Sequence, residues 1–349
     1  MTIHPQFGAS VRKTDLENFK NSPQWNGKKF QNLSTTTMNV SLKTLPKLLK
    51  ENFTNTADRM PHQSLTVMGL DEKAFMADEE SPKFVWYGHS VLLMRLKGKN
   101  ILIDPMFGDN ASPIAPFKTK RFSENTLSII DTLPDIDAVF ITHDHYDHID
   151  YKSLLKLIPK VNNWFVALGV SRHLEKWGLD AAKIQEFDWW NEGEFEEVSF
   201  AFTPSRHFSG RGAFDRAKSL WGGWVFKTSD HSIYWSGDGG YDHHFTKVGD
   251  KYGPFDIMFV ECGQYNEHWH QIHLYPEEAV KAVMDANANI AVPVHWGGFS
   301  LAPHHWKDPI SRFEIEALEQ KQAHFTPSLG QVFGFDDMNS PNPWWKNID

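Results

Sequence analysis

Short apolar runs separated by glycine, proline and charged residues dominate the chain from residue 83 onward. Runs of this length, rich in β-branched and aromatic residues, favour β-strands. The expected strands are residues 84–87, 91–96, 101–103, 138–142, 164–168, 196–203, 223–227, 232–235, 257–260 and 290–294. Helical patterns are expected at residues 152–157, 170–177, 276–286 and 309–319. Strands that alternate with helices, in two halves of the chain, predict an α/β fold in which sheets are covered by helices.

The first 80 residues have a different pattern. They are polar and rich in threonine over residues 31–39, and apolar residues approach helical spacing only over residues 45–53. We therefore expect an N-terminal extension over residues 1–80, partly irregular and containing this short helix. The remaining residues, 81–349, are expected to form the main domain, on which this extension lies.

Composition and charge restrict the class of protein and its partners. The 349 residues are 40% hydrophobic and 23% charged, as in soluble globular proteins. A net charge of −9 argues against a nucleic-acid partner. Residues 1–60 hold nine Lys/Arg and four Asp/Glu, a net of +5 that leaves −14 for the rest, so a basic arm precedes an acidic body. That arm permits at most peripheral contact with an anionic membrane face.

The cysteine content and the lack of long apolar runs bear on location. Cys262 is the single cysteine, so no internal disulfide can form. No run of about 18 apolar residues is present to span a bilayer. We expect a cytoplasmic protein, peripheral at most at the inner membrane face.

The densest chemical signal is a histidine–aspartate cluster directly after the expected strand 138–142. His143, His145, Asp147 and His148 form the pattern H-x-H-x-D-H. A regular helix or strand cannot direct four such closely spaced side chains to one point, but a loop can. Imidazole and carboxylate together suit zinc and related divalent metals. The alternative, a polar loop with incidental histidines, does not account for so dense a pattern.

Three later residues each follow an expected strand. They are His207, Asp238 and His295. Loops at one edge of a layered α/β fold are the usual place for a functional site. With the cluster they make five histidines and two aspartates, enough for two four-coordinate ions if one aspartate bridges them.

This order of ligands resembles the metallo-β-lactamase superfamily, over roughly residues 81–336. The resemblance implies an αββα sandwich with the site at one edge of two sheets. It also implies two zinc ions per chain, although other divalent transition metals fit the same ligands. By the resemblance, His143, His145 and His207 hold the first ion, Asp147, His148 and His295 the second, and Asp238 bridges both.

Further blocks resemble the N-acylphosphatidylethanolamine phospholipase D family and its bacterial relatives, which are zinc phosphodiesterases of lipids. The blocks are WYGHS at 86–90, IDP at 103–105, RHF at 206–208, LWGGW at 220–224, SGDGGY at 236–241, YPEEAV at 275–280 and HWG at 295–297. The resemblance also implies a histidine near the metals at His273. We expect Asp147 and Asp238 to orient the attacking hydroxide and His273 to protonate the leaving group, unless His273 only orients a ligand.

Other residues and other functions remain open. His89 and Asp104 are expected to support the ligands rather than to bind metal. An apolar wall for an acyl chain is expected from Tyr265, Trp221, Trp296 and Phe299, although aromatic residues also simply fill cores. The substrate is expected to be a lipid or small-molecule phosphodiester, and a homodimer is possible. The main alternative is a lactonase or other ester or amide hydrolase with the same metals. A di-iron redox protein and a binding module without metal fit the ligand set less well.

Overall fold

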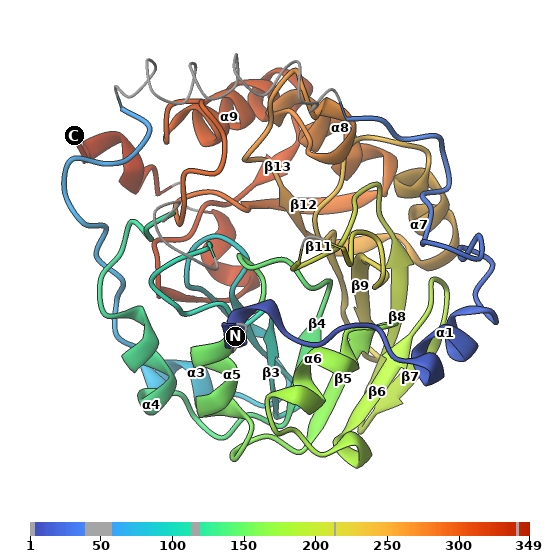
Figure 1. The fold of residues 1–349 in the computed structure, drawn as a ribbon. Coiled ribbons are helices and arrows are strands. Elements are labelled where there is room, and N and C mark those ends of the chain that lie inside the picture. The colour runs from blue at the N-terminus through green and yellow to red at the C-terminus, as the bar shows by residue number, and fades with distance from the viewer. Residues whose placement is uncertain (1–3, 39–57, 113–118, 213, 340–341) are drawn as a thin grey trace.

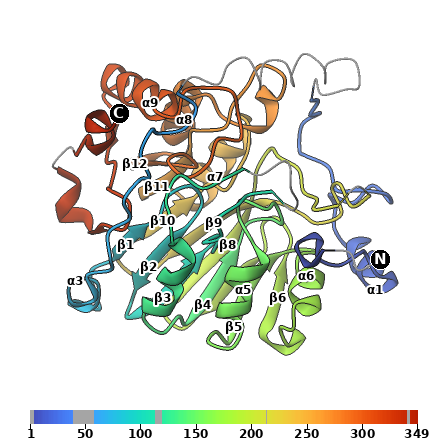
Figure 2. The ribbon, with the colours of Figure 1, turned by 60° about the vertical axis from the view of Figure 1, so that its left-hand side comes forward.

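Two seven-stranded sheets lie against each other in the computed structural model, which describes residues 4–38, 58–112, 119–212, 214–339 and 342–349 (Figures 1 and 2). The first sheet has the order β14 (Val332–Phe333), β1 (Lys83–Trp86), β2 (Leu92–Leu96), β3 (Lys99–Ile103), β4 (Ala138–Ile141), β5 (Asn163–Ala167) and β6 (Ile184–Phe187). The second has the order β13 (Ala323–His324), β12 (Ala288–Val294), β11 (Phe255–Glu261), β10 (Ser232–Trp235), β9 (Gly222–Lys227), β8 (Val198–Pro204) and β7 (Glu192–Phe195).

Each sheet is half antiparallel and half parallel. In the first sheet β14, β1, β2 and β3 pair antiparallel, and β3 to β6 pair parallel. The second sheet repeats this plan, antiparallel from β7 to β10 and parallel from β10 to β13. Parallel strands end at the same edge of a sheet, so the loops that follow them gather there. This arrangement brings distant parts of the chain to one edge.

Helices cover the outer faces of the sheets (Figures 1 and 2). The helices α4 (Ile129–Thr132), α5 (Tyr151–Leu157) and α6 (Ser171–Lys176) lie on the side of the first sheet, and α7 (His244–Tyr252), α8 (Pro276–Asp285) and α9 (Asp308–Gln320) on the side of the second. Two further short helices are α1 (Lys13–Phe19) and α3 (Glu72–Met76). Helix α8 begins at Pro276 because proline suits the first turn, and Glu278 accepts from the Tyr275 N–H at 3.1 Å.

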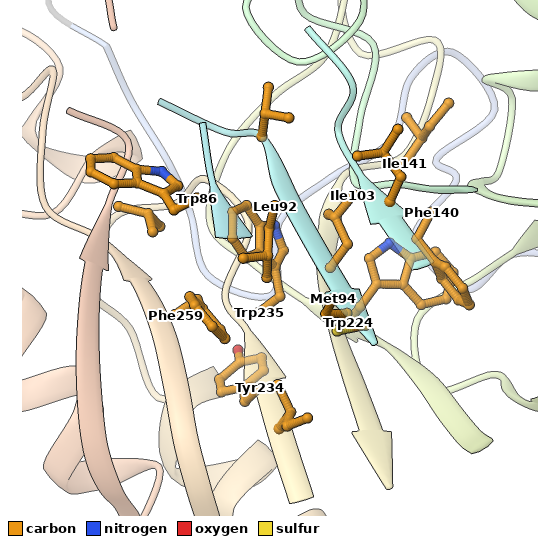
Figure 3. Close-up of a cluster of buried hydrophobic side chains, with 14 of the residues drawn as sticks. Trp86, Leu92, Met94, Ile103, Phe140, Ile141, Trp224, Tyr234, Trp235 and Phe259 are labelled. Atoms are coloured by element: carbon orange, nitrogen blue, oxygen red, sulfur yellow. The ribbon is translucent and has the colours of Figure 1, made fainter. Parts of the chain in front are cut away.

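Aromatic side chains fill the space between the sheets (Figure 3). Phe140 of β4 meets Trp224 and Phe226 of β9 edge-on, with ring centroids 5.0 and 4.8 Å apart. Phe84 of β1 packs on Phe259 of β11 at 5.4 Å. Residues of both sheets therefore share one core, and this packing fixes the position of one sheet relative to the other.

The expected α/β sandwich is confirmed. All ten expected strands and all four expected helices are present, with ends that differ by a few residues. The elements not predicted from the sequence are the strands β6, β7, β13 and β14 and the helices α1, α3, α4 and α7. Strand β6 has adjacent polar residues and β7 alternates exposed glutamates with half-buried residues, so neither contains an apolar run. The expected helix over 45–53 lies outside the described residues, and the division at residue 80 stays a prediction.

Candidate metal centre

The histidine–aspartate cluster lies on residues 142–148, where β4 ends. Asp104, which follows β3, anchors the start of this loop: its carboxylate accepts from the Thr142 N–H at 2.8 Å and from the Thr142 hydroxyl at 2.7 Å. Asp104 also accepts from His148 Nδ1 at 2.8 Å. One buried carboxylate thus joins the first residue of the loop to its last ligand candidate.

A first group of nitrogens converges from β4 and β8. His145 Nδ1 lies 2.9 Å from His143 Nε2 and 3.1 Å from His207 Nε2. The other ring nitrogen of His207 donates to the Ile272 carbonyl at 2.9 Å. Its Nε2 therefore presents a lone pair toward the other two rings, as a metal ligand does.

A second group adjoins the first. His295 Nε2 lies 3.2 Å from Asp147 Oδ2, and His148 Nε2 lies 3.7 Å from the same oxygen. His89 also contacts this oxygen through Nε2 at 2.8 Å. His89 is thus one of the possible ligand atoms of this group, and its expected supporting role stays a prediction.

Asp238 lies between the two groups. Its Oδ2 is 3.0 Å from His148 Nε2 and 3.1 Å from His295 Nε2, and it is 3.9 Å from His143 Nε2 and 3.8 Å from His207 Nε2. One carboxylate oxygen thus faces ligand candidates of both groups. This is the position that a bridging ligand requires.

The turn before Asp238 depends on glycine. Gly237 has φ of 62°, which favours a residue without a Cβ. A Cβ at this position would lie 2.2 Å from the Gly222 carbonyl oxygen. Glycine therefore lets β10 end close to β9 and aims Asp238 at the cluster.

Strained backbone recurs around the cluster. His89, Asp104 and His295 all have positive φ, at 55°, 43° and 65°. Residues other than glycine rarely adopt this conformation, and it gathers at functional sites where the surrounding fold enforces it. All three side chains point to the two ligand groups or to their direct partners.

Burial and charge set the protonation of the cluster. Burial favours neutral carboxyl groups, but neighbouring histidines outweigh it and hold the pKa values of Asp147 and Asp238 well below their usual range. Burial likewise disfavours charged histidines, and it lowers the pKa of His145 to about 4. At His295 the carboxylates of Asp238 and Asp147 outweigh burial and raise the pKa to about 10. In the bare protein, positive charge on such histidines offsets the buried carboxylates, a role that a divalent cation takes over when it binds.

The donor set fits a divalent metal. The described residues contain four overlapping groups of possible ligand atoms, and within each group the atoms lie within 4.8 Å of one another. Most members of these groups are the seven expected ligands, His143, His145, Asp147, His148, His207, Asp238 and His295. His148 donates through Nδ1 to Asp104, so Nε2, which lies 3.0 Å from Asp238 Oδ2, is the nitrogen that would bind a cation beside two carboxylates. Nitrogen and oxygen donors in this combination suit zinc.

His273 lies at the mouth of this site. Its Nδ1 is 3.0 Å from Glu261 Oε2, and its ring stacks on His295 with centroids 5.4 Å apart. His273 also lines a cavity of about 360 Å³ with His145, Asp147, His207 and Asp238. The remaining walls include Met38, Phe208, Trp269, Ile272 and Leu301. This cavity is where a substrate would reach the cluster.

None of the four aromatic residues expected to hold an acyl chain lines the cavity over the cluster. Trp296 packs on Trp86 and the C-terminal Trp344, and Phe299 lies between His89 and the Arg121 guanidinium. Tyr265 stacks on His304 and donates its hydroxyl to Asp308. None of these three lines the cavity over the cluster, because their rings are used in packing. Trp221 lines a neighbouring cavity that shares His207 with it.

Of two residues that support the site, Arg211 had no signal in the sequence, whereas Glu261 directly follows the expected strand 257–260, the same strand-end position that marked the ligand candidates. Glu261, at the end of β11, holds His273 and accepts from the Leu274 N–H at 2.8 Å. Buried Arg211 donates to the backbone carbonyls of Asp144 at 2.7 Å and Ile149 at 3.0 Å, and so holds the ligand loop from below. Arg211 also donates to the Gln6 carbonyl at 2.9 Å, which ties the N-terminal segment to this loop. Such contacts span distant residues and leave no local pattern.

The fold and the cluster define a metal-dependent hydrolase. The comparisons with known proteins agree: residues 99–296 match the family model described as a beta-lactamase superfamily domain, and the chain belongs to this superfamily. Igni18, a metallo hydrolase from Ignicoccus hospitalis, has the same fold, with a TM-score of 0.58 at 20% identity over 73% of this chain and 98% of its own.

Three relatives extend the comparison. An uncharacterized protein of Mycobacterium tuberculosis is 38% identical over 75% of this chain and 71% of its own length. The N-acyl-phosphatidylethanolamine-hydrolyzing phospholipase D 1 of Caenorhabditis elegans is 30% identical over 72% and 75%. A metal-dependent hydrolase of Sulfolobus acidocaldarius is 25% identical over 69% and 96%. Among the described residues, no helix is long and apolar enough to cross a membrane.

Proposed function

We propose that the protein is a dinuclear zinc-dependent phosphodiesterase of the phospholipase D type. Its substrate is N-acylphosphatidylethanolamine or a related lipid, and its products are N-acylethanolamine and phosphatidic acid. The observation that carries the dinuclear centre is the position of Asp238 Oδ2, within 4 Å of histidine nitrogens from both ligand groups. Two metal ions, held by these two ligand groups, would suit the displacement reactions of phosphate esters.

The lipid substrate is supported by two further observations. The relative from Caenorhabditis elegans is named for hydrolysis of N-acyl-phosphatidylethanolamine. The cavity over the cluster is lined partly by apolar side chains, among them Phe208, Ile272 and Leu301. Apolar walls beside a metal site suit a phosphodiester that carries acyl chains.

The residues divide the chemistry among them. His143, His145 and His207 would hold the first ion, Asp147, His148 and His295 the second, and Asp238 both. When bound, the ions would supply Lewis acidity and would lower the pKa of a water molecule toward neutral pH. Asp147 and Asp238 lower the net charge of the centre. His273, held by Glu261 through Nδ1, would give a proton to the leaving alcohol from its other ring nitrogen.

The setting of the reaction is part of the proposal. We place the enzyme in the cytoplasm, with at most peripheral contact at the inner membrane face and no nucleic-acid partner. A homodimer is compatible with the proposal and is not required by it, because both ligand groups come from one chain.

Mass-spectrometric product analysis tests this function. Zinc-loaded protein is incubated with N-acylphosphatidylethanolamine in detergent micelles, beside an Asp238→Ala control. We expect N-acylethanolamine and phosphatidic acid from the native protein and neither from the variant. Intact lipid, from protein that holds two metals per chain, would refute the phospholipase activity. Turnover of acyl-homoserine lactones by that same protein would then identify the lactonase alternative.

A further inference from the structure

A second, larger cavity lies beside the candidate metal centre. Its volume is about 910 Å³, and its walls come from the N-terminal residues 29–38 and from residues between His207 and Trp221. It shares Met38, His207, Phe208 and Ile272 with the cavity over the cluster. A ligand in this second cavity would therefore lie next to the reacting centre.

The charge of this cavity is opposite to that of the whole protein. The chain has a net charge of −9, yet Lys29 and Arg216 line the cavity and no Asp or Glu does so within the described part of the chain. Asp215, the residue before Arg216, directs its carboxylate to its own loop, where it accepts from the backbone N–H groups of Arg211 and Gly212 at 3.1 and 2.7 Å. Lys29 and Arg216 thus line the cavity, and no carboxylate stands among the described residues of its wall.

Arg216 is oriented for an anion. Its guanidinium lies over the Phe208 ring at 3.9 Å, and the same ring contacts His145 edge-on at 4.5 Å. Stacking occupies the face of the guanidinium and leaves its in-plane N–H groups available. Their partner among the described residues is Met38 Sδ, which is a weak acceptor. A planar guanidinium whose partner among the described residues is so weak an acceptor suits the two oxygens of a phosphate or carboxylate.

We propose that Arg216 and Lys29 form an anion subsite beside the metal centre, separated from His145 by the single ring of Phe208. The subsite takes a phosphate or carboxylate group carried on a partly apolar ligand, because Phe30, Leu33 and Trp221 line the same cavity. The use of this subsite in turnover rests on the proposed function. Phosphodiesters that carry a second anionic group should then bind to the enzyme more tightly than those without one. The ability of the subsite to bind an anion does not depend on that function.

Calorimetric titration of the metal-free protein tests the subsite. The probes are sn-glycerol 3-phosphate and monomeric dihexanoyl phosphatidic acid, which share a phosphate monoester but differ in apolar chains. We expect Arg216→Ala and Lys29→Ala to weaken binding of either probe, the arginine change by about tenfold. Arg216→Lys keeps the charge without the planar fork and should lie between Arg216→Ala and the native protein.

Lys227→Ala is the matched control. Lys227 lines a separate cavity that also contains Glu192 and Glu194, so its removal should leave both affinities unchanged. Tighter binding of the phosphatidic acid would show that the ligand is a lipid, and equal binding would show that it is a free phosphate group. No binding by the native protein, or equal affinity in the Arg216→Ala and Lys29→Ala double variant, would overturn the proposal.

The two proposals fail separately. Intact N-acylphosphatidylethanolamine together with an Arg216-dependent anion affinity would refute the phospholipase activity alone. Hydrolysis of that lipid together with anion binding that ignores Arg216 would refute the subsite alone.

Discussion

The side-chain amide of Asn32 binds both polar backbone atoms of His207. Its Oδ1 accepts from the His207 N–H at 3.1 Å, and its Nδ2 donates to the His207 carbonyl at 2.9 Å. The Trp221 indole N–H also donates to Asn32 Oδ1, at 2.9 Å. A residue of the N-terminal segment thus positions a ligand candidate that lies 175 residues further along the chain.

Asn32→Ala should weaken metal binding by the first ligand group. Without the amide, the His207 backbone loses two hydrogen bonds and its ring is less well held, and such supporting contacts are worth about 10–100-fold in metal affinity. Competition with a chromophoric chelator measures the change. Asn163→Ala is the control, because Asn163 also donates to a carbonyl but at the start of β5, away from the site. Equal zinc affinity in the Asn32 variant and the native protein would contradict this role.

Asp238→Asn should reduce the metal content of the protein. The amide keeps the size of the carboxylate but removes its charge, so both ligand groups lose an anionic donor. If the native centre holds two ions, as proposed, the variant should hold one or fewer per chain, with hydrolysis reduced at least about 100-fold. Elemental analysis after gel filtration measures the content. Asp131→Asn, which breaks an exposed ion pair with Lys156, should retain both metals. Full metal content in the Asp238 variant would refute the bridging role.

His273→Gln separates proton donation from metal binding. If His273 protonates the leaving group, kcat should fall by about 10²–10⁴ while metal content and KM stay close to native values. Leaving groups of low pKa need no proton, so a p-nitrophenyl phosphodiester should lose much less activity than the lipid. A parallel loss of metal would instead identify His273 as a ligand. Equal losses for the two substrates would show that it does not donate the proton.

His244→Phe should make the protein less sensitive to acid. His244 is buried at the start of α7, and burial lowers its pKa to about 3, against the opposing pull of Asp242. The unfolded chain binds this proton below about pH 6.5, so the free energy of unfolding falls by about 1.4 kcal/mol per unit as pH drops from 6.5 toward 3. Urea denaturation at pH 7, 6 and 5 measures this slope. The native protein should lose stability faster than the variant, and parallel slopes would refute the assignment.

Gly237→Ala should destabilise the protein more than Gly178→Ala. Both glycines have positive φ, 62° and 102°, so both substitutions cost about 1–2 kcal/mol of backbone strain. Only the Gly237 substitution also creates a clash, because the added Cβ would lie 2.2 Å from the Gly222 carbonyl oxygen. A Cβ added at Gly178 would have no atom within 4 Å among those compared. The clash should add about 1–3 kcal/mol. Similar melting temperatures for the two variants would contradict this packing argument.

Local patterns in the sequence determined the strands, the helices and the ligand types. Apolar runs such as 138–141 and 290–294 are visible because a buried strand needs apolar residues in succession, and His143 to His148 stand together in the chain. His207, Asp238 and His295 were predicted from their places after strands, and their roles also from the resemblance of the whole pattern to a known superfamily. Strands β6 and β7 escaped prediction because both are edge strands without an apolar run.

Tertiary structure decided which side chains meet. Asn32 reaches His207, Gln6 reaches Arg211, and Glu261 reaches His273 only because the packed sheets bring their loops to one edge. Likewise, Trp296 and Trp221 are both buried and both stand next to glycines in the sequence, but only Trp221 lines the larger cavity beside the site. Hydrophobic patterning states which residues are buried in an element, but it carries no information on which distant element covers them. That choice is made by the packing of the two sheets, and it sets the geometry of the site.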